Sequence, residues 1–322
     1  MFEPMNPDNW QGRIDRFEEQ PALRWHQSVR PIEQQHGPGI AILGVCCDEG
    51  VQRNQGRPGA RLGPNAIRNA LASQAWHQQQ PLYDAGNIHC DDDNLAQLSL
   101  DQAVHIERLL QQGHFPLILG GGHEIAYGSY LGLSNFLASN ANNKTETSGG
   151  PIGILNFDAH FDLRRDELPS SGTPFLQIAE HCQTQGQEFR YGCLGISETA
   201  NTSALFRRAD QLGVQYRLDE QLNDWQIDDS FDWLQRFIAP LSALYLTIDL
   251  DVLPAATMPG VSAPAARGLP LAMLEALVAR IRTLAGERLK LADLAELNPH
   301  LDVDQRSAKV AARLCHQIVK PI

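Results

Sequence analysis

The chain lacks the features of several large classes of protein. Its 322 residues carry 26 Lys and Arg against 38 Asp and Glu, a net charge of -12, so no basic excess is available to attract a nucleic acid or an anionic membrane surface. No apolar run is long enough to span a bilayer, and the first twenty residues hold no apolar signal segment. The six cysteines show no Cys-x-x-Cys spacing and are sparse for a disulfide framework. We therefore expect a cytoplasmic protein with free thiols and with no nucleic-acid or membrane partner.

What the sequence does contain is a regular alternation of short apolar runs and helical patterns. Apolar runs of four to eight residues predict buried strands, and strands that alternate with helices predict a mostly parallel sheet covered on both faces. We expect one three-layer α/β domain over residues 1–322, with about eight strands and an irregular lead-in over residues 1–38. The expected strands are 40–45, 81–85, 116–119, the run that begins at Ile152, 189–196, 214–217, 243–248 and 289–294.

Local signals mark some of the connections. Ser99 and Gln102 match a capping box, which predicts the start of a helix. Residues 139–150 are polar and without periodicity, which predicts a surface loop. The loop over residues 52–64 is rich in Gly and Arg, and its arginines are expected either to pair with acids or to contact an anionic ligand. Ion pairing is the simpler of these two interpretations.

The segment Ile152 to Arg165 stands out because an apolar run ends in three potential metal ligands. Asp158, His160 and Asp162 are two residues apart, and in an extended segment such side chains point to the same face. Two carboxylates and one imidazole at this spacing predict half of a divalent-metal site.

Two other strand ends carry further candidates. Gly120-Gly121-Gly122 leads from the strand 116–119 to His123, which by itself would more often be a structural histidine. Asp249 and Asp251 follow the strand 243–248, where an Asp-x-Asp in isolation is more simply a turn feature. Together with Asp158, His160 and Asp162, these residues give six ligands, too many for one ion and suitable for two. Their oxygen-rich character favours Mn²⁺ over zinc, although a zinc hydrolase stays conceivable.

These motifs, in order, resemble the ureohydrolase family of arginases and agmatinases. The motifs are Gly-Gly-x-His, Asp-Ala-His-x-Asp, Ser-Gly-Thr-Pro-Phe and a late Asp-x-Asp, and the similarity extends from Gly44 to Pro299. Within the family the chain is most similar to members that hydrolyse N-formimino-L-glutamate to L-glutamate and formamide in histidine degradation. The resemblance implies an arginase-like fold, a possible homo-oligomer and an enzyme that cleaves a C-N bond of a linear amidine.

The resemblance also implies a role for each ligand. One Mn²⁺ would be held by His123, Asp158, Asp162 and Asp249, and the second by Asp158, His160, Asp249 and Asp251, with a hydroxide bridging the two ions. Glu296 matches the acid that faces the substrate's cationic group, and the alternative is a solvent-exposed turn carboxylate, because a Glu near a Pro is common. Asp251 is the nearest candidate to carry the water's proton to the leaving nitrogen.

The sequence departs from arginases at two positions, and both bear on the substrate. Arg164 replaces an asparagine, and its guanidinium could bind a substrate carboxylate; alternatively, Arg164 or Arg165 could simply pair with Asp166 or Glu167. Ser171 replaces the histidine that arginases use for proton transfer. We therefore expect a formimino substrate bound by Arg164, Ser171 and Glu296. The alternatives are a ureohydrolase acting on a guanidino acid such as guanidinobutyrate, and a catalytically silent metal-binding scaffold.

Overall fold

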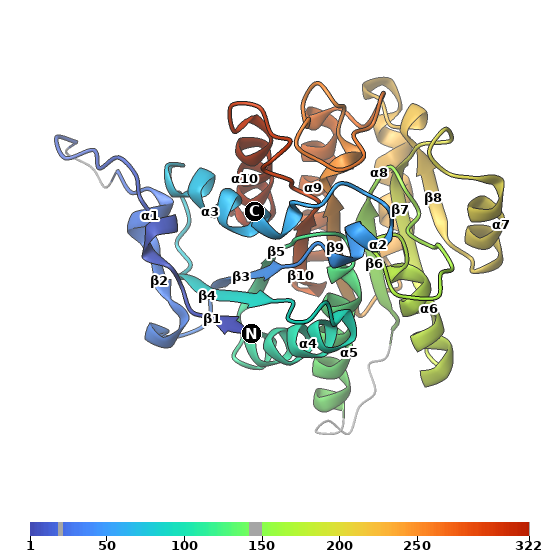
Figure 1. Ribbon diagram of the computed structural model, residues 1–322, viewed down its shortest axis with the longest axis horizontal. Helices are drawn as coiled ribbons and strands as arrows, with labels where there is room; N and C mark the ends of the chain where they lie inside the picture. The colour runs from blue at the N-terminus through green and yellow to red at the C-terminus, as the bar shows by residue number, and fades with distance from the viewer. Residues whose placement is uncertain (19–21, 142–149, 322) are drawn as a thin grey trace.

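The structure, a computed structural model, describes residues 1–18, 22–141 and 150–321. Its centre is a ten-stranded sheet in the order β1-β4-β3-β5-β10-β9-β6-β7-β8, with β2 paired to β4 (Figure 1). The pairings described are parallel except that β1 runs antiparallel to β4. The strands are β1 (Phe2–Glu3), β2 (Val29–Pro31), β3 (Ile40–Cys46), β4 (Leu82–His89), β5 (Phe115–Leu119), β6 (Ile152–Phe157), β7 (Arg190–Ile196), β8 (Gln215–Leu218), β9 (Ala243–Asp249) and β10 (Leu289–Ala295).

Helices cover both faces of this sheet, which makes the predicted three layers. Alternate residues of a strand point to opposite faces, and in β3 Ile40 and Ile42 join one apolar core while Ala41 and Leu43 join the other. The first core is closed by α3 (Gly63–Ala72), α8 (Ile227–Ile238), α9 (Leu271–Ala285) and α10 (Arg306–Val319). The second is closed by α4 (Leu95–Gln111), α5 (Ile125–Ala141), α6 (Pro174–Gln185) and α7 (Ser203–Gln211).

The predicted number of about eight strands is too low, because two short strands lie in the segment expected to be irregular. β1 and β2 have only two and three residues, and both pair with β4 near the edge of the sheet. Runs this short carry no period that a sequence pattern could reveal. The lead-in also contains the helix α1 (Trp25–Ser28), so residues 1–38 are partly ordered into the fold.

Helix boundaries differ from the pattern in two places. The helix α4 begins at Leu95 with Asn94 as its N-cap, and the Ser99 hydroxyl bonds back to the Leu95 carbonyl within the helix, so the predicted capping box is wrong. Side-chain bonding of Ser to a carbonyl four residues earlier competes with capping. The helix α5 continues to Ala141, and most of the expected loop 139–150 lies outside the described residues.

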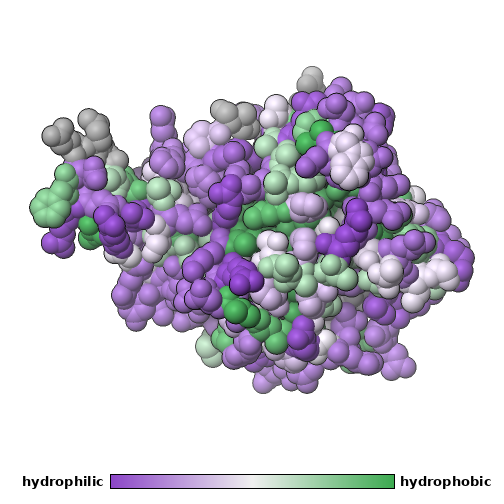
Figure 2. Space-filling view, turned by 90° about the horizontal axis from the view of Figure 1, so that it is seen from above, coloured by the Kyte–Doolittle hydropathy of each residue, from purple (hydrophilic) through white to green (hydrophobic). Residues whose placement is uncertain are grey.

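The surface and the thiols agree with the composition. Hydrophilic residues occupy much of the face seen in Figure 2, and apolar residues gather toward its middle. All six cysteines are free, which confirms the expected thiols. Among the described residues, no helix is both long enough and apolar enough to cross a membrane.

Candidate metal centre and substrate cavity

The candidate site lies where four adjacent strands of the sheet end. β5, β10, β9 and β6 are neighbours in this order, and all four are parallel, so their carboxyl ends meet at one edge. His123 follows β5, Glu296 follows β10, Asp249 ends β9 and Asp158 follows β6. Parallel α/β sheets hold their ligands at this edge. The topology therefore brings together residues that are up to 173 positions apart in the chain, such as His123 and Glu296.

The segment after β6 reaches the site by a route that differs from the expected one. The strand ends at Phe157, before any of the three candidate ligands, and Asp162 has a left-handed backbone with φ of 48°. The extended alternation assumed for Asp158, His160 and Asp162 is therefore wrong. A turn aims the side chains instead, and the Asp158 carboxylate accepts the His160 N–H at 2.6 Å within it.

The triple glycine before His123 is required by a close backbone approach. A Cβ on Gly121 would lie 1.6 Å from the carbonyl oxygen of Cys47, so only glycine fits there. The Gly122 N–H donates to that same carbonyl at 2.9 Å, and the Glu296 N–H donates to the Gly121 carbonyl at 2.7 Å. The glycine loop thus joins β3, β5 and β10 and fixes the backbone from which His123 projects.

The first of two ligand clusters surrounds the His123 ring. Its Nδ1 lies 3.2 Å from Asp158 Oδ2, 3.0 Å from Asp162 Oδ2 and 3.2 Å from Asp249 Oδ2. This nitrogen is buried, and its geometry fits a hydrogen bond to none of the described residues. The imidazole nitrogen faces three carboxylate oxygens without forming a hydrogen bond to any of them. One nitrogen and three oxygens in this arrangement are the donor set of a divalent cation site.

The second cluster shares Asp158 with the first. His160 Nδ1 lies 3.0 Å from Asp251 Oδ2 and 3.5 Å from Asp158 Oδ1. One ligand atom from each of Asp158, His160 and Asp251 falls within 4.8 Å of the others. Asp249 belongs to the first cluster but not to this one, although its Oδ1 accepts the Asp251 N–H at 2.8 Å. The structure brings all six predicted ligands together at two adjoining points.

The electrostatics of the two ligand clusters favour a bound cation. Burial, together with the neighbouring charges of Asp251 and Asp158, raises the pKa of the Asp249 carboxyl well above its usual value. Burial and the charge of Asp158 raise the pKa of Asp162 to about 6. Burial acts to lower the pKa of His123, yet the surrounding carboxylates raise it well above its usual value. A divalent ion balances such a group of buried acids without protonating them.

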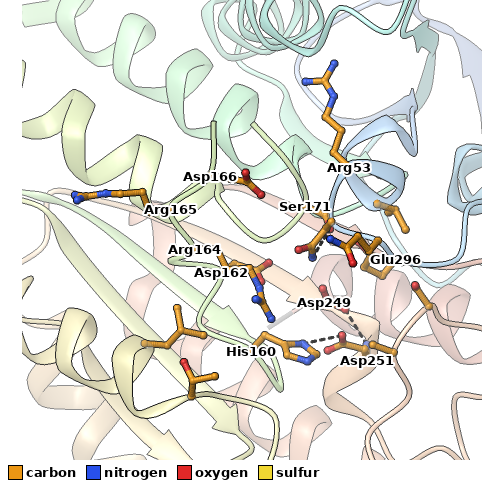
Figure 3. Close-up of a pocket in the computed structure, with 18 of the residues that line it drawn as sticks. Arg53, His160, Asp162, Arg164, Arg165, Asp166, Ser171, Asp249, Asp251 and Glu296 are labelled. Atoms are coloured by element: carbon orange, nitrogen blue, oxygen red, sulfur yellow. Dashed lines mark hydrogen bonds and ion pairs between the residues drawn. The ribbon is translucent and has the colours of Figure 1, made fainter. Parts of the chain in front are cut away.

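A cavity of about 680 Å³ opens over the two clusters. His160, Asp249, Asp251 and Glu296 line it, and Figure 3 shows the first three close together. Glu296 is buried, and its Oε1 accepts the His123 N–H at 2.9 Å, so it is not the solvent-exposed turn carboxylate that its sequence context allowed. The structure therefore holds Glu296 against the cavity beside the first cluster.

The other two predicted substrate contacts also line this cavity. In Figure 3 the Arg164 side chain points toward His160, whereas that of Arg165 points away. Among the described residues, Arg164 forms no side-chain hydrogen bond or ion pair, so the expected alternative of pairing with Asp166 or Glu167 does not occur. Ser171 is buried, and its hydroxyl accepts the Asn54 side-chain amide at 3.1 Å.

The arginines of the glycine-rich loop are used mainly for structure. Arg53 pairs with Glu49 at 2.8 Å, and Arg61 pairs with the buried Asp48, which confirms ion pairing for these two. The Arg57 guanidinium instead donates to the Ser262 carbonyl at 2.7 Å. Residues Glu49–Arg53 form the short helix α2, so the loop begins later than expected.

The sequence analysis did not predict the residues that support the candidate ligands. Asn156 donates to Asp158 Oδ2 at 2.9 Å and lies the same distance from the Tyr191 hydroxyl. Thr247 Oγ1 lies 3.0 Å from His123 Nε2. Such partners orient the groups that would touch a metal. The available signal was position, because Thr247 lies two places before Asp249 on β9, where side chains share a face, and Asn156 lies two places before Asp158, near the end of β6.

The fold has three layers, and the central strands of its sheet lead into two clusters of Asp and His side chains. This combination defines a binuclear metal site of the hydrolase type. The chain belongs to the arginase family, whose sequence pattern matches residues 38–320. This match confirms the family resemblance and the arginase-like fold.

Similar proteins give a narrower comparison. The chain is 54% identical to a formimidoylglutamase of Aeromonas hydrophila, over 99% of both chains. It is 50% identical to a formimidoylglutamase of Chromobacterium violaceum, over 95% of both. Among solved structures, the formimidoylglutamase of Bacillus subtilis has a TM-score of 0.79 at 22% identity, covering 94% of this chain and 93% of that one. A formiminoglutamase of Trypanosoma cruzi solved with Mn²⁺ has a TM-score of 0.72 at 24% identity, covering 88% and 93%.

Proposed function

We propose that this protein hydrolyses N-formimino-L-glutamate to L-glutamate and formamide. The observation that carries the proposal is the division of charge in the cavity, with carboxylates at the metal clusters and, beside them, Arg164, whose side chain pairs with none of the described residues. The substrate has the matching division, since its formimino end is cationic and its other end carries two carboxylates. The relatives with about half of their residues identical carry the corresponding enzyme name, which supports the same substrate.

We further propose that the two clusters hold one metal ion each. His123, Asp158, Asp162 and Asp249 would bind the first, and Asp158, His160 and Asp251 the second. Asp249, which accepts the Asp251 N–H at 2.8 Å, would be a further ligand of the second ion. Mn²⁺ is the proposed ion because oxygen ligands predominate and because the Trypanosoma cruzi relative was solved with Mn²⁺. When bound, such a pair supplies a water activated for attack near neutral pH.

The protein's own residues would orient the substrate and move the proton. Glu296 lies beside the first cluster, where its carboxylate would hold the amidinium and place the formimino carbon over the ions. Arg164 would bind a carboxylate at the other end through its planar fork. Asp251 lines the cavity and would accept a proton from the attacking water and donate it to the leaving glutamate nitrogen. Ser171 would hydrogen-bond the substrate from the wall that it shares with Asn54.

The main alternative is a ureohydrolase acting on another guanidino acid, such as guanidinobutyrate. Such a substrate has one carboxylate, so it would also use Arg164. The two reactions differ in their product, because a guanidino acid yields urea and the formimino substrate yields formamide. A silent metal-binding scaffold is the second alternative, and the six assembled ligands speak against it.

One experiment separates these possibilities. The protein, purified without chelator and assayed with added Mn²⁺, is given N-formimino-L-glutamate, guanidinobutyrate, agmatine and arginine, and formamide, urea and ammonia are measured. Formamide from the first substrate alone is expected. Urea from any guanidino compound as the main product would replace the proposal with the alternative, and no metal-dependent turnover would favour the scaffold. Elemental analysis of the same preparation distinguishes Mn from Zn.

A further inference from the structure

Five of the described arginines line the cavity, namely Arg53, Arg57, Arg164, Arg165 and Arg208. N-formimino-L-glutamate carries two carboxylates, and one edge of a guanidinium pairs with one carboxylate. Ser171 and Glu296, the other proposed substrate contacts, supply no positive charge. A carboxylate that loses water on entering a cavity needs a charged or hydrogen-bonded partner there. The second carboxylate therefore calls for an arginine besides Arg164.

Three of these arginines offer no edge of the guanidinium to a ligand. Arg53 Nε pairs with Glu49 at 2.8 Å, and its other two nitrogens donate to backbone carbonyls. Arg57 Nε and Nη2 both donate to the Ser262 carbonyl, at 2.9 and 2.7 Å, so the edge that could bind two oxygens is occupied. The Arg165 side chain points away from the clusters in Figure 3. Arg208 is the arginine that is left.

The guanidinium of Arg208 keeps one edge open. Arg208 lies on α7, is half-buried and donates through Nη1 to the Leu163 carbonyl at 2.5 Å. Among the described residues, its Nε and Nη2 have no hydrogen-bond partner and the side chain forms no ion pair. These two N–H groups form the side-on edge that binds both oxygens of a carboxylate. The single bond to Leu163 thus fixes the guanidinium and leaves its binding edge available.

The helix that carries Arg208 is fixed to the turn that carries the metal ligands. Asn201, which is buried just before α7, donates to the Ala159 carbonyl at 2.8 Å and accepts the Phe161 N–H at 3.1 Å. Ala159 and Phe161 flank a candidate ligand, and Leu163, which accepts from Arg208, follows in the same turn. Hydrogen bonds from both ends of the helix therefore set the position of Arg208 relative to the metal clusters.

We propose that Arg208 binds the side-chain carboxylate of N-formimino-L-glutamate, while Arg164 binds its α-carboxylate. The inference rests on the proposed function and adds the residue that selects a dicarboxylic substrate. The α-carboxylate is attached two atoms from the formimino carbon, and the side-chain carboxylate lies two methylenes further away. Arg164 points toward His160 in Figure 3, so it meets the nearer carboxylate. Arg208 projects from a helix that supplies none of the six candidate ligands, so it meets the farther one.

Arg208→Gln tests this role with two substrates. N-formimino-L-glutamine is the second substrate, because a neutral amide replaces its side-chain carboxylate. We expect kcat/KM for N-formimino-L-glutamate to fall by roughly 10- to 150-fold, mainly through KM. For N-formimino-L-glutamine it should change by no more than about twofold, because the pair that the variant removes is absent there. Formamide release with added Mn²⁺ measures both values, and thermal unfolding verifies that the variant folds.

Two further variants separate carboxylate binding from support of the turn. Arg207→Gln is the matched control, because Arg207 is exposed on the same helix and does not line the cavity, and both substrates should stay within about twofold of the parent. Arg208→Lys keeps the charge and loses the side-on edge, so it should recover part of the loss with N-formimino-L-glutamate. Equal fold losses for the two substrates in Arg208→Gln and Arg208→Lys would reduce Arg208 to a support of the turn and overturn the inference.

A third substrate tests which carboxylate each arginine binds. N-formimino-4-aminobutyrate lacks the α-carboxylate, so Arg208→Gln should impair its hydrolysis as strongly as that of N-formimino-L-glutamate. A loss with N-formimino-L-glutamate that this compound does not share would overturn the assignment. Failure of the parent protein to release formamide from any of the three compounds would refute the proposed function and the inference together. Formamide release by the parent with equal losses in Arg208→Gln would refute only the role of Arg208.

Discussion

At the scale of single residues, the cavity has carboxylates at the metal clusters and an arginine beside them. Glu296, Asp249 and Asp251 lie with the metal clusters, and Arg164 extends toward them from the turn after Asp162 (Figure 3). Several other arginines line the same cavity, but the guanidinium of Arg53 is held by Glu49 and by the carbonyls of Pro169 and Asp93. Arg57 donates to the Ser262 carbonyl and Arg208 to the Leu163 carbonyl, and the Arg165 side chain points away from the clusters in Figure 3. Among the described residues, Arg164 is therefore the arginine of the cavity best able to accept a new partner.

Arg164→Asn should weaken substrate binding more than metal binding. A hydrogen-bonded ion pair contributes about 1.5–3 kcal/mol, so KM for N-formimino-L-glutamate should rise by roughly 10- to 150-fold while Mn²⁺ content stays at the parent level. Arg165→Asn is the matched control, because its side chain points away in Figure 3 and should leave KM nearly unchanged. Steady-state kinetics and elemental analysis measure the two quantities. Equal losses of substrate and metal affinity would contradict this division of roles.

Asp251 combines two proposed roles, and a conservative variant separates them. Asp251→Asn keeps an oxygen that can bind an ion but loses the group that exchanges a proton. With Mn²⁺ raised until occupancy is restored, kcat should still fall by about 10²- to 10⁴-fold. Turnover and metal content are measured on the same sample. Full occupancy with full turnover would rule out proton transfer through Asp251.

At the scale of secondary-structure elements, the loop after β5 determines where His123 lies. Its backbone is fixed by the contact between Gly121 and Cys47 at the end of β3 and by the hydrogen bond from Glu296 after β10. Glu296 adopts a left-handed backbone with φ of 72°, a conformation that costs energy in a residue other than glycine. The site is thus assembled by strained connections between strands that pack rigidly.

Gly121→Ala tests this contact. The added methyl would meet the Cys47 carbonyl at 1.6 Å, where backbone cannot move aside cheaply, so a loss of more than about 4 kcal/mol of stability is expected. Gly37→Ala is the control, since a Cβ there has no described atom within 4 Å and should change stability by less than about 0.5 kcal/mol. Thermal unfolding and Mn²⁺ binding report both effects. Parent-like metal binding in Gly121→Ala would show that the loop has another way to place His123.

At the scale of the whole molecule, a buried ion pair joins α3 to the sheet, and the lead-in is bonded to it through Trp10. Arg68 of α3 donates to both carboxylate oxygens of Asp84 in β4, and each residue is 1% exposed. The indole of Trp10 donates to the same carboxylate at 2.7 Å. The first residues of the chain are therefore packed against the sheet by a polar contact that no hydrophobic pattern marks.

Arg68→Ala should destabilise the whole fold without touching the site. It leaves Asp84 charged and buried, which costs about 3–5 kcal/mol. Arg313→Ala removes a pair with Glu275 that is largely solvent-exposed on its arginine side, and it should cost no more than about 1 kcal/mol. Unfolding of the metal-free variants compares the two. A loss in Arg68→Ala no larger than in Arg313→Ala would mean that Asp84 finds other partners or gives up its charge.

The sequence by itself determined the fold class, the family and the identity of the six clustered side chains. Alternating apolar runs specify a covered parallel sheet because burial on both faces demands it. The motif spacing named His123 and Asp249 although each has a simpler structural interpretation, because the family pattern contains both.

Tertiary structure alone decided how those side chains converge. The turn through Asp162, the fit of Gly121 against Cys47 and the register that sets Asp293 beside Thr247 depend on segments distant in the chain. The short strands β1 and β2 likewise exist only because β4 is there to pair with them. Local patterns carry hydrophobic period and motif spacing, whereas backbone clashes, register and hydrogen-bond direction are properties of the packed chain.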